Sequence, residues 1–182
     1  MPKQLTVALA GNPNAGKSTI FNALTGARQH VGNWPGKTVE KKEGLCRYGD
    51  YEINVVDLPG TYSLSAYSLE EVIARDYLLE AKPDVVIDVI DAANLERNLY
   101  LAIQILELES PLVIALNMSD IAAARGLRIN IAKLSEGLGR VPVVPTVATK
   151  KQGIDELIRQ LISVAELRYS EEKSYRRGKK DG

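Results

Sequence analysis

Eight residues near the N-terminus, residues 11–18 (GNPNAGKS), have the types and the spacing needed to hold a phosphate group. They fit the pattern G-x-x-x-x-G-K-[ST], in which backbone N–H groups surround phosphate oxygens. Gly11 and Gly16 let the backbone curl, Lys17 would contact the β- and γ-phosphates, and Ser18 is a candidate Mg²⁺ ligand. The pattern predicts a nucleotide site formed by Gly11, Asn12, Pro13, Asn14, Ala15, Gly16, Lys17, Ser18 and Thr19.

A second group of residues is suited to sensing the terminal phosphate. Residues 57–60 (DLPG) follow an apolar segment and form the pattern D-x-x-G. Asp57 would hold Mg²⁺ through a water, and Gly60 can bring its N–H close to the γ-phosphate because glycine lacks a Cβ. Thr38, after a long Gly-, Pro- and Asn-rich loop, is the candidate for a further Mg²⁺ ligand. A loop that is ordered only by the γ-phosphate would act as a switch.

The pattern N-x-x-D, at Asn117 and Asp120, indicates recognition of guanine. The carboxylate of Asp120 would accept hydrogen bonds from guanine N1–H and the 2-amino group, which adenine does not offer. Met118 stands where many GTPases have a lysine, so it would cover the base without cationic attraction. A phosphate loop alone leaves ATP binding open as an alternative. Backbone N–H groups toward guanine O6 are expected from Val147, Ala148 and Thr149.

The order of predicted elements places these motifs at the ends of strands. Apolar runs alternate with helix-like segments, which is typical of an α/β fold with a mainly parallel sheet. Residues 38–48 and 51–57 predict a hairpin that adds one antiparallel edge strand, whereas residues 27–37 predict a loop. Ser68, with Glu71 three residues later, predicts a capped helix start. A last amphipathic helix is expected over residues 154–167.

Composition limits the classes of function. The chain of 182 residues has 23 basic and 23 acidic side chains, and this balance argues against a protein that mainly grips nucleic acid. Cys46 is the only cysteine, so no disulfide can form within the chain, and we expect it to be a semi-buried strand residue. No apolar run approaches the ~20 residues of a membrane span. We therefore expect a cytosolic domain over residues 1–167, followed by a charged linker or disordered tail over residues 168–182.

Four segments together resemble the cytosolic G domain of ferrous iron transport protein B (FeoB). They are GNPNAGKST, VGNWPGKTVEKKEG, DLPGTYSLSAYSLEE and ARDYLLEAKPDVVIDVIDAANLERNLYL, and G-N-W-P-G is the most specific part. The resemblance covers about residues 3–167. It implies a Ras-like P-loop GTPase fold: a six-stranded, mostly parallel sheet with one antiparallel edge strand and helices on both faces. It also implies attachment to a membrane-embedded iron-permease part at the cytosolic face of the membrane.

The resemblance further implies how GTP would be hydrolysed. Thr61 follows D-x-x-G where Ras-type enzymes carry a water-orienting glutamine, and Pro13 replaces the glycine that admits an arginine finger. By resemblance to cation-dependent GTPases, the amide oxygen of Asn14 would bind K⁺, with backbone carbonyls of Gly32 and Trp34 completing the shell. An exposed Trp34 acting as a docking anchor is the alternative. The expected catalytic residues are Lys17, Asn14, Thr38 and Gly60.

Two other functions stay open at this point. The domain would be a nucleotide-gated binding module if hydrolysis only resets its shape. It would be an RNA- or ribosome-associated GTPase if it carried a basic RNA-binding domain, but only the short tail after residue 167 is basic enough to suggest one. The sequence leaves the formation of a homo-oligomer undecided. The leading interpretation is a slow, Mg²⁺-dependent and K⁺-stimulated GTPase that regulates a ferrous iron transporter.

Overall fold

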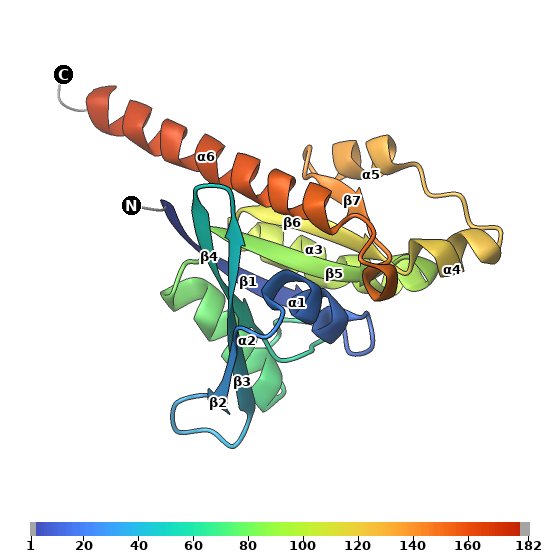
Figure 1. The fold of residues 1–182 in the computed structure, drawn as a ribbon, viewed down its shortest axis with the longest axis horizontal. Helices are drawn as coiled ribbons and strands as arrows, with labels where there is room; N and C mark the ends of the chain where they lie inside the picture. Colours follow the sequence, from blue (N-terminus) through green and yellow to red (C-terminus); the bar gives the residue numbers. More distant parts are fainter. Residues whose placement is uncertain (1–2, 179–182) are drawn as a thin grey trace.

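A central sheet with helices on both faces forms the molecule in the computed structural model, which describes residues 3–178 (Figure 1). In these residues the sheet has seven strands in the order β2-β3-β4-β1-β5-β6-β7. The strands are β1 (Lys3–Gly11), β2 (Gln29–Asn33), β3 (Glu40–Tyr48), β4 (Tyr51–Asp57), β5 (Val85–Asp91), β6 (Leu112–Asn117) and β7 (Val143–Pro145). The helices are α1 (Lys17–Thr25), α2 (Leu69–Glu80), α3 (Leu95–Glu107), α4 (Ser119–Ala124), α5 (Ile131–Gly137) and α6 (Ile154–Gly178), with short 3₁₀ turns η1 (Ala92–Asn94) and η2 (Ala148–Lys150).

The five strands from β4 to β7 in this order run parallel to one another. Their carboxyl ends therefore lie along one edge of the sheet, and ligands of open parallel sheets bind at such an edge. The predicted motifs end or follow these strands: Gly11 closes β1, Asp57 closes β4 and Asn117 closes β6. The prediction of an α/β fold with a mostly parallel sheet is confirmed.

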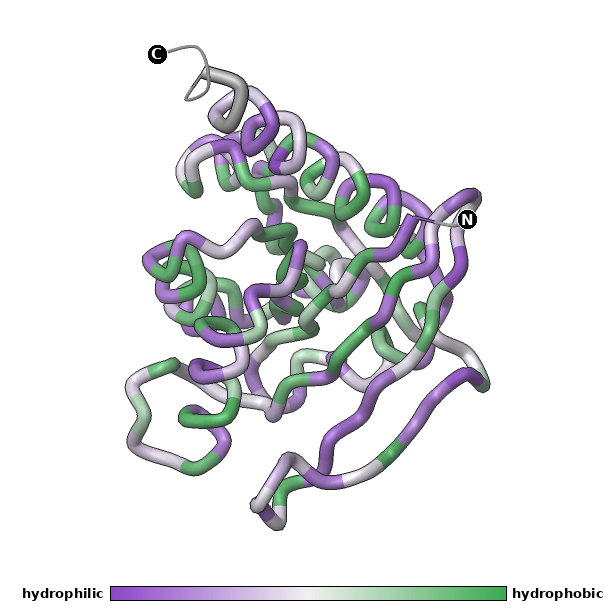
Figure 2. Tube along the Cα trace, turned by 90° about the vertical axis from the view of Figure 1, so that its left-hand side faces the viewer, coloured by the Kyte–Doolittle hydropathy of each residue, from purple (hydrophilic) through white to green (hydrophobic). Residues whose placement is uncertain are grey.

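The number of strands differs from the prediction, because residues 27–37 are not only loop. Strand β2 pairs antiparallel with β3, from Gln29 opposite Gly44 to Asn33 opposite Glu40. All five residues of β2 are exposed, so the strand has no buried face and no apolar alternation that could reveal it. The expectation of six strands is therefore wrong by one. The β2–β3 hairpin projects below the sheet in Figure 1, and its strands are mainly hydrophilic in Figure 2.

Two apolar layers hold the helices against the sheet. One face packs on α1 and α6 through Phe21 and Leu157, and the other packs on α2 and α3 through Ile73 and Leu101. Burial of such side chains is the main favourable contribution to folding, at roughly 25 cal/mol per Å² of apolar surface. The two layers fix the strand ends relative to one another, which is what a site assembled from several strands requires.

The start of α2 agrees with the predicted cap, and its acidic partner acts on the preceding loop. The Ser68 hydroxyl accepts a hydrogen bond from the Glu71 backbone N–H at 3.1 Å, as expected. The Glu71 carboxylate accepts hydrogen bonds from the Tyr67 N–H at 2.9 Å and the Ser63 hydroxyl at 3.0 Å. Glu71 thereby fixes the loop that follows D-x-x-G.

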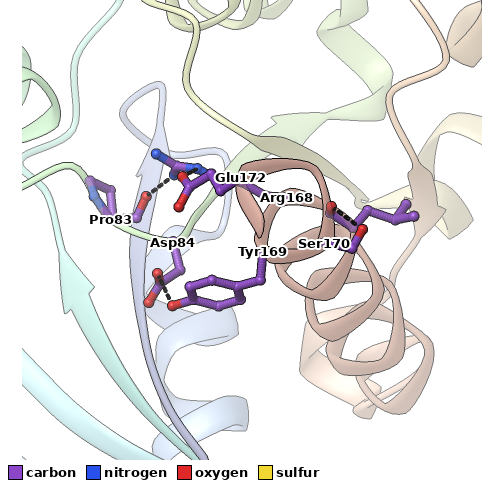
Figure 3. A network of polar contacts seen from close by, with 7 residues as sticks. Pro83, Asp84, Arg168, Tyr169, Ser170 and Glu172 are labelled. Atoms are coloured by element: carbon purple, nitrogen blue, oxygen red, sulfur yellow. Dashed lines mark hydrogen bonds and ion pairs between the residues drawn. The ribbon is translucent and has the colours of Figure 1, made fainter. Parts of the chain in front are cut away.

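Helix α6 continues past Leu167, where we predicted a charged linker or disordered tail. Residues 168–178 extend the helix, while residues 179–182 lie outside the described part of the chain. The Tyr169 hydroxyl donates to Asp84 Oδ1 at 2.6 Å, and Arg168 Nη1 donates to the Pro83 carbonyl at 3.3 Å (Figure 3). These contacts with residues distant in the sequence hold the extension against the domain. The extension has no regularly spaced apolar residues that could have predicted a packed helix. The division into a domain and a tail stays a prediction.

Two expectations from composition can be compared with the fold. Cys46 is a free, buried cysteine on β3, and burial raises the pKa of its thiol. This agrees with the structural role expected for it. No helix within residues 3–178 is both long and apolar enough to cross a membrane.

Asp88 is a fully buried carboxyl group in the middle of β5. It is 1% exposed, and its strand neighbours are Ala10 on β1 and Ile114 on β6. Its Oδ2 atom has no hydrogen-bond partner among the described residues. Burial raises the pKa of Asp88 to about 8. Since an aspartate in the unfolded chain has a pKa of about 3.9, folding takes up a proton between about pH 4 and pH 8.

The substitution Asp88→Asn should therefore stabilise the fold, increasingly as the pH rises. The native chain is destabilised by Asp88 only where the aspartate must be kept neutral against its ordinary pKa. Its free energy of unfolding therefore has its full value below about pH 4 and falls as the pH rises toward 8, by up to about 1.4 kcal/mol per pH unit. Urea denaturation at pH 5, 6, 7 and 8 measures the effect, with the exposed Asp155→Asn as control. Parallel pH profiles for Asp88→Asn and the native chain would contradict this prediction.

Candidate functional site

The loop between β1 and α1 needs glycine at two positions for steric reasons. Gly16, which caps α1, has φ +91°, in the left-handed region. A Cβ at Gly16 would lie 2.2 Å from Asn117 Nδ2, and one at Gly11 would lie 2.8 Å from the carbonyl oxygen of Val89. A side chain at either position would push the loop away from the neighbouring strand ends. The glycine spacing that suggested phosphate binding is thus also required by the packing.

A pocket of about 430 Å³ lies at the carboxyl edge of the sheet and brings three of the predicted motifs together. The phosphate loop forms most of its wall, D-x-x-G contributes Gly60, and N-x-x-D contributes Met118. Met118 adopts a left-handed backbone conformation with φ +57°. The residues lining the pocket are Asn12, Pro13, Asn14, Gly16, Lys17, Ser18, Gly60 and Met118.

An ion pair joins the phosphate loop to β4 beside this pocket. Lys17 Nζ contacts Asp57 Oδ1, and both side chains are only 11% exposed. Burial raises the pKa of Asp57 above its ordinary value, and the positive charge of Lys17 opposes that shift. Removing either partner would leave a poorly solvated charge. The pair therefore fixes a cation and a carboxylate where the sequence predicts phosphate and Mg²⁺ contacts.

The side chain of Asn117, at the end of β6, connects two loops and is 3% exposed. Its Nδ2 donates to the Ala15 carbonyl at 3.1 Å. Its Oδ1 accepts from the Thr146 hydroxyl and from the Ala148 N–H, both at 3.1 Å. Asn117 thus ties the phosphate loop to the segment after β7. We predicted it only as part of a base-binding motif, and its role as a connector depends on contacts between loops that are far apart in the sequence.

Asp120 lies just past this connector and outside the residues that line the pocket. Its side chain is 39% exposed, and its Oδ2 lies 3.4 Å from Lys150 Nζ. Its Oδ1 accepts from the N–H of Ile121 at 2.9 Å. Lys150, which directly follows the predicted segment 147–149, is a neighbour of the motif that we did not predict. Val147 and Ala148 are buried there.

Three predicted metal ligands from the β2–β3 hairpin, Thr38, Gly32 and Trp34, lie outside the pocket wall, as does Asp57 beside it. Gly32 is exposed on β2, and Thr38 is exposed in the loop that follows. The Trp34 carbonyl accepts a hydrogen bond from the Lys37 N–H at 2.9 Å. Their roles as ligands stay predictions.

Trp34 is not the exposed residue that the docking-anchor alternative assumed. It is 7% exposed, and its ring meets Tyr77 of α2 edge to face, with centroids 5.5 Å apart. Lys41 Nζ lies 5.0 Å from the centroid of the same ring. The docking-anchor alternative therefore lacks the exposed ring that it assumed, because the loop folds back onto α2.

Comparison with known proteins assigns the sequence to a family. The family model described as Ferrous iron transport protein B matches residues 5–161. The chain is 55% identical over 163 residues to a Porphyromonas gingivalis protein named Fe(2+) transport protein A/Fe(2+) transporter FeoB fusion protein. It is also 55% identical over 159 residues to the Fe(2+) transporter FeoB of Escherichia coli K12. These matches cover 89% and 85% of this chain but 19% and 20% of the relatives, so the chain spans about a fifth of their length.

Solved structures agree with the fold and the family. The G domain of the T. maritima FeoB iron transporter is 48% identical with a TM-score of 0.84, and the match covers 90% of this chain and 99% of that one. A mutant S. thermophilus NFeoB bound to mGDP is 50% identical with a TM-score of 0.83, covering 87% and 60%. The predicted Ras-like P-loop GTPase fold is thereby confirmed.

The substitution Asn117→Ala should destabilise the protein by about 2–4 kcal/mol even without any ligand, because it leaves three buried polar groups unpaired. Thr146→Val removes only one of these hydrogen bonds and should cost about 1 kcal/mol. Urea denaturation of the nucleotide-free protein measures both. Equal stability of Asn117→Ala and the native chain would show that the connector does not hold the loops.

Proposed function

Because the chain belongs to the ferrous iron transport protein B family, we propose that it binds GTP, hydrolyses it slowly and regulates a ferrous iron transporter. The observation that carries this proposal is the pocket that joins the phosphate loop, Gly60 of D-x-x-G and Met118 of N-x-x-D. Relatives in this family are about five times longer, so the iron-permease part, and attachment of this domain to its cytosolic side, belong to the proposal.

Guanine recognition rests on Asp120 and the segment that Asn117 positions. Asp120, two residues after Met118, keeps a partly exposed carboxylate. Guanine would offer it two donors, whereas adenine would leave the carboxylate facing an unmatched edge. Met118 would cover one face of the base through its thioether. The Ala148 N–H is already held by Asn117 at 3.1 Å, and the Val147 N–H donates to the Gln152 carbonyl at 3.1 Å. The proposed contact to guanine O6 therefore falls to the Thr149 N–H.

The oxygen donors around the phosphate loop suit Mg²⁺ brought in with the nucleotide. Among the described residues, no group of three or more His, Cys, Asp or Glu side chains could hold a metal by itself. Mg²⁺ sites commonly use one or two protein oxygens together with phosphate oxygens. The exposed Ser18 hydroxyl and the Asp57 carboxylate fit this requirement, with Thr38 as a later addition. Bound Mg²⁺ would neutralise charge on the β- and γ-phosphates.

Slow hydrolysis is expected because the site lacks a side chain that orients the attacking water and has a proline at the position where an arginine finger would enter. Thr61 is 5% exposed, and its N–H donates to the Gly11 carbonyl at 3.1 Å, so it is poorly placed to orient a water. Pro13 stands beside Gly60 where an arginine finger would otherwise enter. Such a finger is worth a factor of about 10³–10⁵ in rate. Asn14 is exposed in the pocket wall with φ +66°, and its amide can accept a cation in place of the missing arginine.

A switch role is the remaining part of the proposal. The loop after Gly60 rests on α3, because the Leu64 N–H donates to Gln104 Oε1 at 2.8 Å and Arg97 stacks 4.3 Å over the Tyr62 ring. A movement of Gly60 toward the γ-phosphate would alter these surface contacts. The same contacts favour the second candidate function, a nucleotide-gated binding module. In such a module, a partner would recognise the GTP- or GDP-bound shape of the domain, and GTP hydrolysis would only reset that shape.

The substitution Asp120→Asn should change the preferred base from guanine to xanthine, since an amide can donate a hydrogen bond to the additional oxygen of xanthine. Calorimetric titration with GDP and xanthosine diphosphate should show GDP affinity falling at least about 100-fold, or roughly 2.7 kcal/mol. The exposed Asp155→Asn serves as control. Undiminished GDP binding by Asp120→Asn would refute guanine reading by this carboxylate.

Hydrolysis should be at least about tenfold faster in KCl than in NaCl, a difference of roughly 1.4 kcal/mol in the barrier. Asn14→Ala should abolish the stimulation, because it removes the proposed amide ligand of K⁺. Steady-state phosphate release at equal ionic strength measures both, and Asn22→Ala, which removes an exposed amide on α1, is the matched control. Equal rates in the two salts would remove the cation from the mechanism.

A further inference from the structure

Asn12 differs from every other residue of the phosphate loop in having a buried polar side chain. Only 3% of its surface is exposed, although it borders the nucleotide pocket. Neither its Nδ2 nor its Oδ1 has a hydrogen-bond partner among the residues that the structure describes. Asn14, two residues later, is exposed instead. An amide that is buried without partners destabilises the state in which it is found.

Asn98 shows how this fold treats another buried asparagine. It is 4% exposed, so its burial matches that of Asn12. Its Oδ1 accepts from the Asp91 N–H at 3.2 Å, and its Nδ2 donates to the Asn94 carbonyl at 2.9 Å. The fold therefore satisfies a buried amide where the role is structural. The unpaired amide of Asn12 points to a partner that arrives in another state of the protein.

The residues on either side of Asn12 contact the start of the D-x-x-G loop. The Gly11 carbonyl accepts from the Thr61 N–H at 3.1 Å, and a Cβ at Gly60 would lie 3.5 Å from Pro13. Gly60 and Thr61 thus contact the two chain neighbours of Asn12. Gly60 is also the residue that, under the proposed function, moves toward the γ-phosphate.

From this arrangement we infer that Asn12 is a positioning residue, whose amide pairs with the backbone of Gly60 or Thr61 when that loop closes on the γ-phosphate. This inference rests on the proposed function, because it needs a nucleotide with a γ-phosphate. The amide is unpaired in the described structure, and closure of the loop would give it a backbone partner. The pairing therefore favours the GTP-bound state over the GDP-bound state without a contact between Asn12 and the nucleotide.

The test compares the same two substitutions, to Leu and to Ala, at Asn12 and at Asn98. Leu has nearly the shape of Asn but no hydrogen-bonding atoms, and Ala avoids any clash from the Leu methyl groups. Thermal unfolding of the nucleotide-free protein is measured first. At least one Asn12 variant should melt no lower than the native chain, because no hydrogen bond is lost, whereas both Asn98 variants should melt at least about 2–4 °C lower.

The second readout is the affinity for a non-hydrolysable GTP analogue divided by the affinity for GDP. This ratio should fall at least fivefold in the Asn12 variants and stay within twofold of native in Asn98→Leu. An unchanged ratio, or melting of both Asn12 variants as low as the Asn98 pair, would overturn the inference while leaving the proposed function standing. Native protein that binds neither nucleotide would overturn both.

Discussion

Lys17 on the first turn of α1 and Asp57 at the end of β4 form an ion pair that joins the phosphate loop to the sheet. Both side chains are 11% exposed, so neither charge is well solvated without the other. Removing one partner of a buried pair of this kind is strongly destabilising, because it leaves the other charge buried and uncompensated. Under the proposed function, the phosphates of a nucleotide would be a second anionic partner for Lys17. The pair therefore keeps the pocket ready while preserving the charge that binding needs.

This ion pair can form only because the parallel strands end along one edge. Gly11 and Gly16 allow the loop to run close to Val89 and Asn117, where any Cβ would collide. Asn117 then fixes the loop against the segment after β7 through three hydrogen bonds of 3.1 Å. The phosphate end and the base end of the site are thus connected through one buried amide.

The sequence predicts the parts of this site that are encoded locally. The phosphate loop, Asp57 and Asn117 occupy the predicted strand ends, because apolar strands and glycine-containing turns are specified by neighbouring residues. Strand β2 escaped prediction since all its residues are exposed and only its pairing with β3 defines it. The extension of α6 depends on Tyr169 and Arg168 meeting residues 83–84 from a distant part of the chain. Burial of Trp34 against Tyr77 is likewise a tertiary contact.

Selective guanine binding at the carboxyl edge of the sheet is the central claim. Its most direct measurement is a calorimetric titration of GDP and of ADP into the native nucleotide-free protein in the presence of Mg²⁺. GDP should bind at least about 100-fold more tightly than ADP, a difference of roughly 2.7 kcal/mol. Equal affinities for the two nucleotides, or tighter binding of ADP, would contradict the account.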